Sequence, residues 1–526
     1  MKKFAPRHGR LASSIRLLGS ALAAALTLAA CGGGGGAPGA LSNPGPVVTT
    51  PSVVADPALS TLGDAFATYW NLCAKPRTGN DPATGQPYPD KQGTLRDELT
   101  FLRAWTHQNY LWYNEVPTDF RMADFSNPID YFAKLKTPAR TASGTLKDQF
   151  HFTYDSAEWD KLNSAGIELG YGLTWSSGGA TAPRSWHIAV VEPGSPAAVA
   201  GLRRGDQLTG IDGVDFVNAS DAASVNKIND AMYPDTVGES HSFTVKRGTA
   251  SLTATMAARD VTALSVKGTK VIDTPTGKVG YLSFENHNAV AERQLIDAFT
   301  TLKAAAVTDL VLDMRYNGGG LLGIASELGY MIAGPASQGQ VFERLQYNNK
   351  IKVDPNDTIL FAQSAYGYPA GAGTVAQGTT LPHLDLRRVT ILTTEGTCSA
   401  SEAVINALRG IDVQVDVIGA QTCGKPYGFT PVPNCGTTYF SIEFQGVNAK
   451  GFGDYSDGFA PTCAVADDLT RETGDPAEAL LATALSYRST GICPPQARTS
   501  AQAMAVTART VVRPRVSQIA IHTKAR

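Results

Sequence analysis

The stretch Leu310-Val311-Leu312-Asp313-Met314-Arg315-Tyr316-Asn317-Gly318-Gly319-Gly320 is an apolar run that ends in a glycine-rich turn. Another apolar run occupies residues 279–284, and between the two runs apolar residues recur at helical spacing over residues 289–306. Short apolar runs that alternate with amphipathic helices are typical of parallel strands joined by crossover helices. We therefore predict a βαβ unit whose second strand ends at the glycine turn.

The same alternation continues on the C-terminal side of the glycine turn. The pattern predicts a helix near residues 321–332, a strand at 389–393, a helix at 401–408 and a strand at 413–418. These elements extend the βαβ unit into an α/β core, which we place at residues 263–492.

Upstream of this core, residues 166–262 change to short strands separated by glycine-rich turns. The segment Ile188-Ala189-Val190-Val191-Glu192-Pro193-Gly194-Ser195-Pro196-Ala197-Ala198-Val199-Ala200-Gly201-Leu202-Arg203-Arg204-Gly205-Asp206-Gln207-Leu208 predicts a strand, a turn and a short helix that Ser195 caps and Pro196 begins. It resembles a bacterial PDZ domain. In that resemblance, Gly170-Tyr171-Gly172-Leu173 stands where backbone N–H groups hold a peptide carboxylate, and the peptide adds a strand to the sheet edge. The alternative is a module that serves only as a lid or spacer.

The N-terminal end predicts export. Residues 1–30 carry basic residues before an apolar run that is too short to remain as a spanning helix. The run ends in Leu28-Ala29-Ala30-Cys31, which resembles a bacterial lipoprotein signal and implies lipidation of Cys31. Because Gly32 replaces the Asp that retains some lipoproteins at the inner membrane, the resemblance implies an outer-membrane anchor, facing the periplasm or the cell surface. An ordinary cleaved secretory signal is the alternative.

Three further regions complete the predicted organisation. Residues 31–58 are rich in Gly, Pro, Ser and Thr and predict a flexible linker. Residues 59–165 show helical spacing and predict a small helical domain. Residues 493–526 contain no Asp or Glu and have weak periodicity, so we predict a mostly disordered tail. The predicted fold class is multidomain α/β: a helical N-terminal domain, a β-sandwich-like PDZ domain and an α/β core.

Composition limits the partners of the chain. A formal net charge of −2 and 17% charged residues give no basic field, so nucleic-acid binding is disfavoured. Beyond the leader, no uninterrupted apolar run reaches the length of a membrane span. The cysteines other than Cys31 allow three disulfides in an exported chain, and Cys423 with Cys435 is a plausible local pair, although free thiols are the alternative. Their spacing lacks the paired C-x-x-C of a zinc site, so no metal is predicted.

The segment Thr397-Cys398-Ser399-Ala400-Ser401-Glu402-Ala403 lies between a predicted strand and a predicted helix. A serine on such a turn is exposed and faces a helix N-terminus, as a nucleophile requires. Lys425 follows 26 positions later, just after the next strand, so neighbouring parallel strands would bring both residues to one edge of the sheet. A desolvated lysine can be neutral near pH 7 and accept the serine proton. Considered alone, Ser399 would be interpreted as a helix N-cap and Lys425 as a surface lysine.

Together these motifs resemble the carboxyl-terminal processing, or tail-specific, serine peptidases. The resemblance implies that Ser399 is the nucleophile, that Lys425 is the general base, and that Glu402 supports this pair. It also implies an oxyanion hole formed by the backbone amides of Gly319 and Ala400, and a crotonase/ClpP-like peptidase core. No cofactor is implied, and the expected partners are polypeptide substrates. The oligomeric state stays open.

Three positions depart from the family pattern. Phe429 stands four positions after the lysine, where many members carry a Gln that orients the base. Gly318 replaces a proline, and Cys398 precedes the nucleophile. These departures motivate an alternative function, namely a catalytically weak or silent lipoprotein of the same fold that binds peptides or small ligands.

The segment Gly318-Gly319-Gly320-Leu321-Leu322-Gly323 also fits the dinucleotide pattern G-x-G-x-x-G, with Glu343 20 positions further on. However, the residues Arg315-Tyr316-Asn317 separate these glycines from the strand end, and an exported chain lacks a supply of NAD. Dinucleotide binding is therefore the minor hypothesis for this turn.

Overall fold

The computed structural model describes residues 55–62, 66–82, 84–495 and 510–512. The chain divides into two units, residues 1–56 and 57–526, and every described helix and strand belongs to the second. The predicted signal segment and Cys31 lie outside the described residues. None of the helices in the described ranges is both long and apolar enough to span a bilayer.

A six-stranded sheet forms the centre of the predicted α/β core, in the order β12-β13-β14-β17-β18-β23. β12 pairs with β13 in antiparallel fashion, and all other neighbours are parallel. The predicted adjacency of the strands that precede Ser399 and Lys425 is confirmed, because β17 pairs with β18 up to Thr393↔Gly419. The elements of this layer are β12 (Val266–Thr274), β13 (Gly277–Phe284), α8 (Ala291–Ala304), β14 (Asp309–Asp313), α9 (Leu322–Ala333), β17 (Arg388–Thr393), α10 (Ala400–Gly410), β18 (Gln414–Gly419), β23 (Cys463–Ala464) and α11 (Ala479–Thr490).

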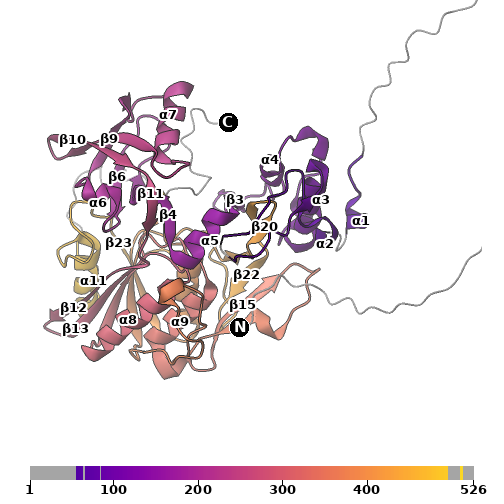
Figure 1. Ribbon diagram of the computed structural model, residues 1–526. Coiled ribbons are helices and arrows are strands. Elements are labelled where there is room, and N and C mark those ends of the chain that lie inside the picture. The colour runs from indigo at the N-terminus through magenta and orange to yellow at the C-terminus, as the bar shows by residue number, and fades with distance from the viewer. Residues whose placement is uncertain (1–54, 63–65, 83, 496–509, 513–526) are drawn as a thin grey trace, which may run out of the picture. The chain divides into compact units, whose positions relative to one another are not determined.

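Helices cover both faces of this sheet, because successive strand side chains point to opposite sides. Leu310 and Leu312 of β14 pack in one apolar cluster with α8, α9 and α10. Val311, which lies between them, belongs to a second cluster with Leu480 and Leu481 of α11. The near-continuous apolar run of β14 is therefore explained by burial on both faces. Figure 1 shows α8 and α9 beside the strands of the sheet.

The region predicted to be a PDZ domain forms a seven-stranded sheet with two helices. The strand order is β10-β9-β7-β6-β5-β24, with β8 paired to β7. As predicted, Ser195 caps the short helix, because its hydroxyl accepts a hydrogen bond from the Ala198 N–H at 3.1 Å and Pro196 occupies the first turn. The elements are β5 (Leu173–Ser177), β6 (Trp186–Val191), α6 (Pro196–Val199), β7 (Gln207–Ile211), β8 (Val214–Asp215), α7 (Ala222–Met232), β9 (Ser240–Arg247), β10 (Ala250–Ala257) and β24 (Thr510–Val512). β4 (Ile167–Gly170) and β11 (Arg259–Thr262) pair separately at the two ends of this region.

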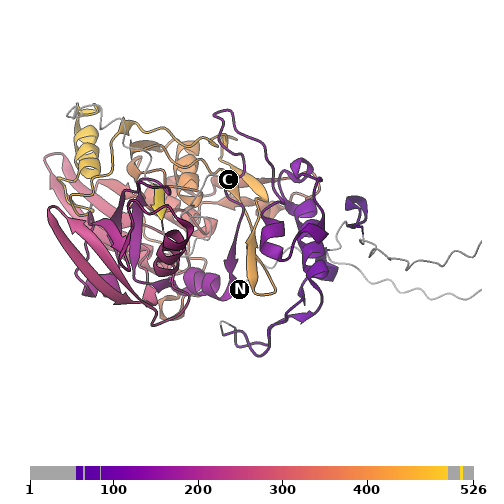
Figure 2. The same cartoon turned by 90° about the horizontal axis from the view of Figure 1, so that it is seen from above.

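The N-terminal region is helical, as its spacing predicts, and a hairpin from much later in the chain completes its core. Tyr439 and Ile442 pack with Leu102 and Trp105 of the longest helix, α3. The hairpin also pairs with β3 in a three-stranded sheet, and in Figure 2 these orange strands lie beside the indigo helices. The elements are α1 (Leu59–Leu62), α2 (Phe66–Tyr69), β1 (Leu72–Cys73), β2 (Lys91–Gln92), α3 (Leu95–Asn109), η2 (Tyr113–Glu115), η3 (Met122–Asp124), α4 (Pro128–Phe132), β3 (Phe152–Asp155), α5 (Ser156–Ala165), β20 (Val432–Asn434) and β21 (Thr437–Phe440).

A small four-stranded sheet, in the order β16-β15-β22-β19, combines two strands that precede the lysine loop in the chain with two that follow it. Its strands are β15 (Val341–Tyr347), β16 (Thr358–Leu360), β19 (Tyr427–Gly428) and β22 (Phe444–Val447), and the short helices η4 (Gly334–Ser337), η5 (Pro355–Asp357) and η6 (Gly371–Gly373) lie in the connections. β19 begins two residues after Lys425, so this sheet fixes the C-terminal side of the lysine loop.

Three disulfides join the six cysteines after Cys31. The pairs are Cys73–Cys435, Cys398–Cys423 and Cys463–Cys493. The predicted local pair Cys423–Cys435 is therefore wrong. Cys435 lies in the turn of the late hairpin, which packs on the N-terminal region, so its partner is distant in sequence.

Candidate active site

Ser399 lies on the turn between β17 and α10, and its backbone is in the left-handed region, with φ 57° and ψ −117°. A residue other than glycine in this region carries about 1–3 kcal/mol of backbone strain, and the surrounding packing must hold it in this conformation. The residue is half-buried. A serine held in this way at the start of a helix presents its hydroxyl where a substrate carbonyl can approach.

The glycine-rich turn after β14 packs directly against Ser399. A Cβ atom on Gly319 would lie 2.7 Å from the Cβ of Ser399 and 2.9 Å from the backbone nitrogen of Ala400. Gly319 also has a φ of 99°, which side chains rarely adopt. Only glycine fits here, and the fit places the turn against both Ser399, the predicted nucleophile, and the first amide of α10.

Glu402 joins the nucleophile turn to the loop that carries the lysine. Its fully buried carboxylate accepts hydrogen bonds from the N–H of Ser399 at 3.0 Å, the hydroxyl of Thr422 at 2.6 Å, the N–H of Gly424 at 2.9 Å and the N–H of Lys425 at 2.8 Å. Burial raises the pKa of Glu402, and these hydrogen bonds oppose the rise. Glu402 therefore holds the backbones of both predicted catalytic residues.

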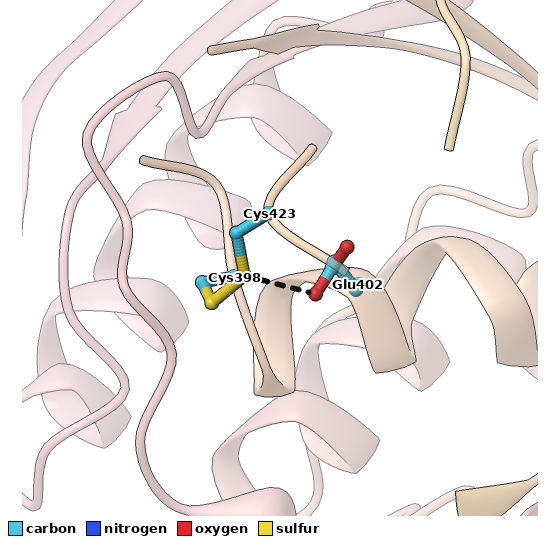
Figure 3. A group of neighbouring side chains, drawn as sticks. All are labelled: Cys398, Glu402 and Cys423. Atoms are coloured by element: carbon cyan, nitrogen blue, oxygen red, sulfur yellow. Dashed lines mark hydrogen bonds between the residues drawn. A yellow bond between two sulfur atoms is a disulfide. The ribbon is translucent and has the colours of Figure 1, made fainter. Parts of the chain in front are cut away.

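A covalent link lies beside this carboxylate. Figure 3 shows the Cys398–Cys423 disulfide against Glu402, and the Cys423 sulfur lies 3.4 Å from Oε2. The two sulfurs and the carboxylate bring three ligand atoms within 4.8 Å of one another. Both sulfurs are consumed by the disulfide, however, and the carboxylate already accepts four hydrogen bonds. In this oxidised state the cluster fastens two loops together and offers no thiolate to a metal ion.

Lys425 is buried beneath two aromatic rings. Its Nζ lies 4.0 Å from the ring centroid of Phe429 and 4.9 Å from that of Phe150, and only 7% of the residue is exposed. Burial lowers the pKa of Lys425 to about 7, and the negative charges of Asp148 and Glu402 partly oppose this effect. A large fraction of the amine is therefore uncharged at neutral pH, as a general base requires.

Two of the predicted contacts are not made in this conformation. Within the described residues, no hydrogen bond joins the Ser399 hydroxyl to the Lys425 amine, which lies over the rings instead. The N–H of Gly319 donates to Oδ1 of Asn317 at 3.0 Å and is therefore not directed at an oxyanion. His287 also binds this oxygen, with its Nδ1 at 3.0 Å, and burial lowers the pKa of His287 to about 4. His287 is thus a neutral support of the glycine turn.

Three residues of the site escaped the sequence analysis. Asn317 stands in the quoted glycine segment and could have been noted there, because a side-chain amide beside a glycine turn can bind its backbone. Asp148 and Phe150 offered no such signal, since Phe150 lies 275 positions before Lys425. Only the packing of the N-terminal region on the core brings them to the lysine.

The predicted peptide-binding loop lies between β4 and β5. Gly172 has a φ of 75°, and a Cβ there would lie 2.3 Å from the Cβ of Ser195, so the loop packs tightly against the start of α6. Leu173 begins β5 directly after it. A recess beside the loop is lined by Glu168 and Glu192, and Glu192 forms an ion pair with Lys267. The four predicted residues, Gly170-Tyr171-Gly172-Leu173, thus lie together between the end of β4 and the start of β5.

Two of the three glycines of the dinucleotide pattern are explained by the protein's own packing. A Cβ on Gly320 would lie 2.6 Å from the backbone oxygen of His287, and a Cβ on Gly323 would lie 2.0 Å from the Tyr368 hydroxyl. A Cβ on Gly318, the first glycine of the pattern, would have no neighbouring atom within 4 Å. Neither Gly320 nor Gly323 needs a phosphate to account for it, so the dinucleotide hypothesis gains no support from these two positions.

Comparisons with known proteins identify three of the regions described above. Residues 99–153 match the peptidase S41 N-terminal domain, residues 187–247 a PDZ domain, and residues 278–447 peptidase family S41. A solved S41 protease from Bacteroides fragilis is 25% identical, with a TM-score of 0.58 over 77% of this chain and 98% of that one. Over these residues the chain is similar to PDZ-containing peptidases of family S41.

Two relatives found by sequence similarity are named as carboxyl-terminal processing enzymes. A carboxyl-terminal-processing protease of Picosynechococcus is 28% identical over 44% of this chain and 49% of its own length. The chloroplastic C-terminal processing peptidase of Tetradesmus obliquus is 24% identical over 64% of this chain and 69% of its own length. The chain thus spans about half to two thirds of these relatives, and over that part it is similar to carboxyl-terminal processing peptidases.

Proposed function

We propose that this chain is a serine endopeptidase that cleaves exported polypeptides, with Ser399 as nucleophile and Lys425 as general base. The observation that carries the proposal is the pairing of a strained serine with a desolvated amine on two adjacent loops. Glu402 binds both backbones, and the Cys398–Cys423 disulfide ties the loops covalently. The burial that lowers the Lys425 pKa to about 7 supplies the uncharged amine that a Ser/Lys pair needs.

The proposed reaction begins when the Lys425 side chain leaves the Phe429 ring and turns toward Ser399. Lys425 takes the hydroxyl proton as the serine oxygen attacks the scissile carbonyl. The protonated lysine then gives this proton to the departing amine, the C–N bond breaks, and an ester remains on Ser399. A water molecule, deprotonated by the same lysine, hydrolyses the ester and restores the enzyme.

Two backbone amides are proposed to bind the oxyanion. The N–H of Ala400 stands at the first position of α10, where helices leave amides without an intrahelical partner and where the dipole favours negative charge. The N–H of Gly319 becomes the second donor once it leaves Oδ1 of Asn317. Aligned donors of this kind contribute about 3 kcal/mol each to transition-state stabilisation.

The remaining parts of the proposal concern delivery of the substrate. The loop Gly170-Tyr171-Gly172-Leu173 and the adjoining β5 edge would hold the C-terminal segment of an unfolded polypeptide. Lipidation of Cys31 would tether the enzyme to the outer membrane. Incorporation of a labelled fatty acid into the wild type, but not into Cys31→Ala, tests the anchor separately from catalysis.

A second function is favoured by the conformation of the site itself. Lys425 lies beneath Phe429 and Phe150, and the Gly319 amide is bound to Asn317, so the resting site is not aligned for catalysis. A family member locked in this state would bind polypeptides without cutting them.

Cleavage of an unfolded casein separates the two functions. We expect the wild type to cleave it, and we expect Ser399→Ala and Lys425→Ala each to lower the initial rate by about 10²-fold or more, as loss of a nucleophile or base does. Fragments are quantified by mass spectrometry, and circular dichroism confirms folding.

Ser489→Ala, which removes an exposed serine at the end of α11, is the matched control and should cleave at the wild-type rate. Equal rates for the wild type, Ser399→Ala and Lys425→Ala would eliminate the peptidase proposal. If the wild type and the variants all bind casein without cleaving it, the silent alternative is established.

A further inference from the structure

The C-terminal tail returns to the PDZ sheet. β24 pairs with β5 in antiparallel fashion, with Thr510 opposite Ser177, Val511 opposite Ser176 and Val512 opposite Trp175. It is the last strand in the order β10-β9-β7-β6-β5-β24, so β5 would be the edge of the sheet without it. The prediction of a mostly disordered tail is therefore incomplete, because these three residues form a strand.

The polarity of this pairing is that of a PDZ ligand. β5 begins at Leu173, directly after the Gly170-Tyr171-Gly172 loop, and runs away from it. An antiparallel partner therefore runs toward the loop, as β24 does from Thr510 to Val512. Peptides that add a strand to a sheet edge bind mainly through main-chain hydrogen bonds, so β24 covers the backbone groups that a substrate would need.

The tail differs from a free peptide terminus at one point. The sequence continues for 14 residues after Val512, so the strand carries no carboxylate at the loop. Arg513 and Arg515 follow instead. Carboxylates outnumber the cations in the recess beside the loop, where Glu168, Glu192 and Glu285 accompany Lys267.

We propose that residues 510–512 are an intramolecular ligand of the PDZ domain and compete with polypeptide substrates for the β5 edge. The inference rests on the substrate-holding role of the PDZ domain given above. Because the strand belongs to the same chain, it competes at an effective concentration of the order of millimolar and raises the apparent Kd of every competing peptide by the same factor. The tail thereby sets a threshold of affinity that a substrate must exceed.

Peptide binding measures this competition directly. A fluorescein-labelled synthetic peptide with the sequence of residues 505–512 is titrated, by fluorescence anisotropy, into the Ser399→Ala protein and into the same protein ending at Pro495. We expect Kd to fall by about tenfold or more when the tail is removed, because the fraction of binding-competent domain rises. Faster hydrogen exchange at residues 174–177 in the shortened protein should locate the change on β5.

A second variant keeps the full chain. Val511→Pro removes one backbone N–H from β24 and should tighten peptide binding as the deletion does. Val506→Pro lies in the same tail outside β24 and should leave Kd unchanged. Equal Kd values in the full-length, shortened and Val511→Pro proteins, or no binding to any of them, would overturn the proposal. Because Ser399 is absent from all of these proteins, either result leaves the cleavage test untouched.

Discussion

At the scale of single residues, the two rings over Lys425 act on its pKa in opposite directions. The face of an aromatic ring stabilises a cation, which raises the pKa of an amine, whereas exclusion of water lowers it. The pKa of Lys425 is lowered to about 7, so desolvation outweighs both the rings and the nearby carboxylates. Phe150 and Phe429 therefore act mainly by excluding water from the amine.

This balance predicts the pH dependence of activity. The reaction needs an uncharged amine, so kcat/KM should rise with pH and reach half its plateau near pH 7 in the wild type. Phe429→Ala admits water, stabilises the charged amine and should move this midpoint upward by about one pH unit. The measurement is the pH profile of kcat/KM on a fluorogenic peptide.

Phe429→Leu is the matched control, because it removes the ring and keeps an apolar wall. If desolvation dominates, this variant should retain a midpoint near that of the wild type. An unchanged midpoint in Phe429→Ala would contradict the assignment of Lys425 as the titrating base.

The sequence could indicate Ser399, Lys425, Glu402 and the glycine turn because each lies within a short motif. It could not indicate what surrounds the lysine amine, since the surroundings come partly from Phe150 and Asp148 of the N-terminal region. A pKa depends on burial, and burial is a property of the assembled core.

At the scale of elements, α10 and the loop after β18 form one clamp. Glu402 holds the loop by hydrogen bonds, and Cys398–Cys423 holds it covalently. The N–H of Cys398 also donates to the backbone oxygen of Asn317 at 3.1 Å, so the clamp includes the glycine turn. A shift at the disulfide would reach the proposed nucleophile, the proposed base and the glycine turn together.

Removal of this disulfide should weaken catalysis without unfolding the core. We expect the double variant Cys398→Ser/Cys423→Ser to lose about 3 kcal/mol of stability by the loop-entropy model. Its kcat should fall several-fold, because the turn and the lysine loop lose their covalent alignment. Activity assays with and without dithiothreitol make the measurement, and the wild type should fall to the level of the variant when reduced.

Cys463→Ser/Cys493→Ser removes the bridge between β23 and the chain after α11, and it should keep its kcat. Loss of kcat in this control to the same extent would show that the effect is one of general stability. The sequence predicted three bridges, yet not their pairing, because spacing along the chain does not reveal which loops meet.

At the scale of the whole molecule, a buried ionic network connects the PDZ region to the catalytic turn. Arg204 binds Asp467 at 2.8 Å and donates to the Tyr316 hydroxyl. Asp467 also pairs with Arg315 at 2.8 Å. Tyr316 directly precedes Asn317, which binds the Gly319 amide. Movement of the turn at Arg204 can therefore reach the predicted oxyanion hole.

Arg204→Ala should separate catalysis from peptide capture. We expect kcat to fall by about tenfold, since breaking a buried pair leaves Asp467 partly uncompensated and Tyr316 free to shift. Binding of the residue 505–512 peptide to the shortened protein should not change. Steady-state kinetics and anisotropy provide the two readouts.

Arg247→Ala is the control within the same domain. Arg247 pairs with Asp206, the residue directly before β7, and not with Asp467. The network has no catalytic role if Arg204→Ala and Arg247→Ala lower the thermal midpoint alike while kcat stays at the wild-type value.

The order of the regions along the chain was predictable from periodicity and motifs, whereas the exchange of segments between regions was not. The late hairpin that completes the N-terminal core has ordinary strand spacing. Its sequence does not indicate the region against which it packs. The three residues of β24 are too few for any period to be detected. Both pairings depend on which sheet edges the folded regions leave open.

The Cys73–Cys435 bridge keeps the chain in one piece after a single cut. A single backbone cut anywhere from residue 74 to residue 434 leaves two polypeptides that remain covalently joined. Proteolytic damage to a surface turn of the PDZ region would therefore yield a two-chain protein whose pieces stay together.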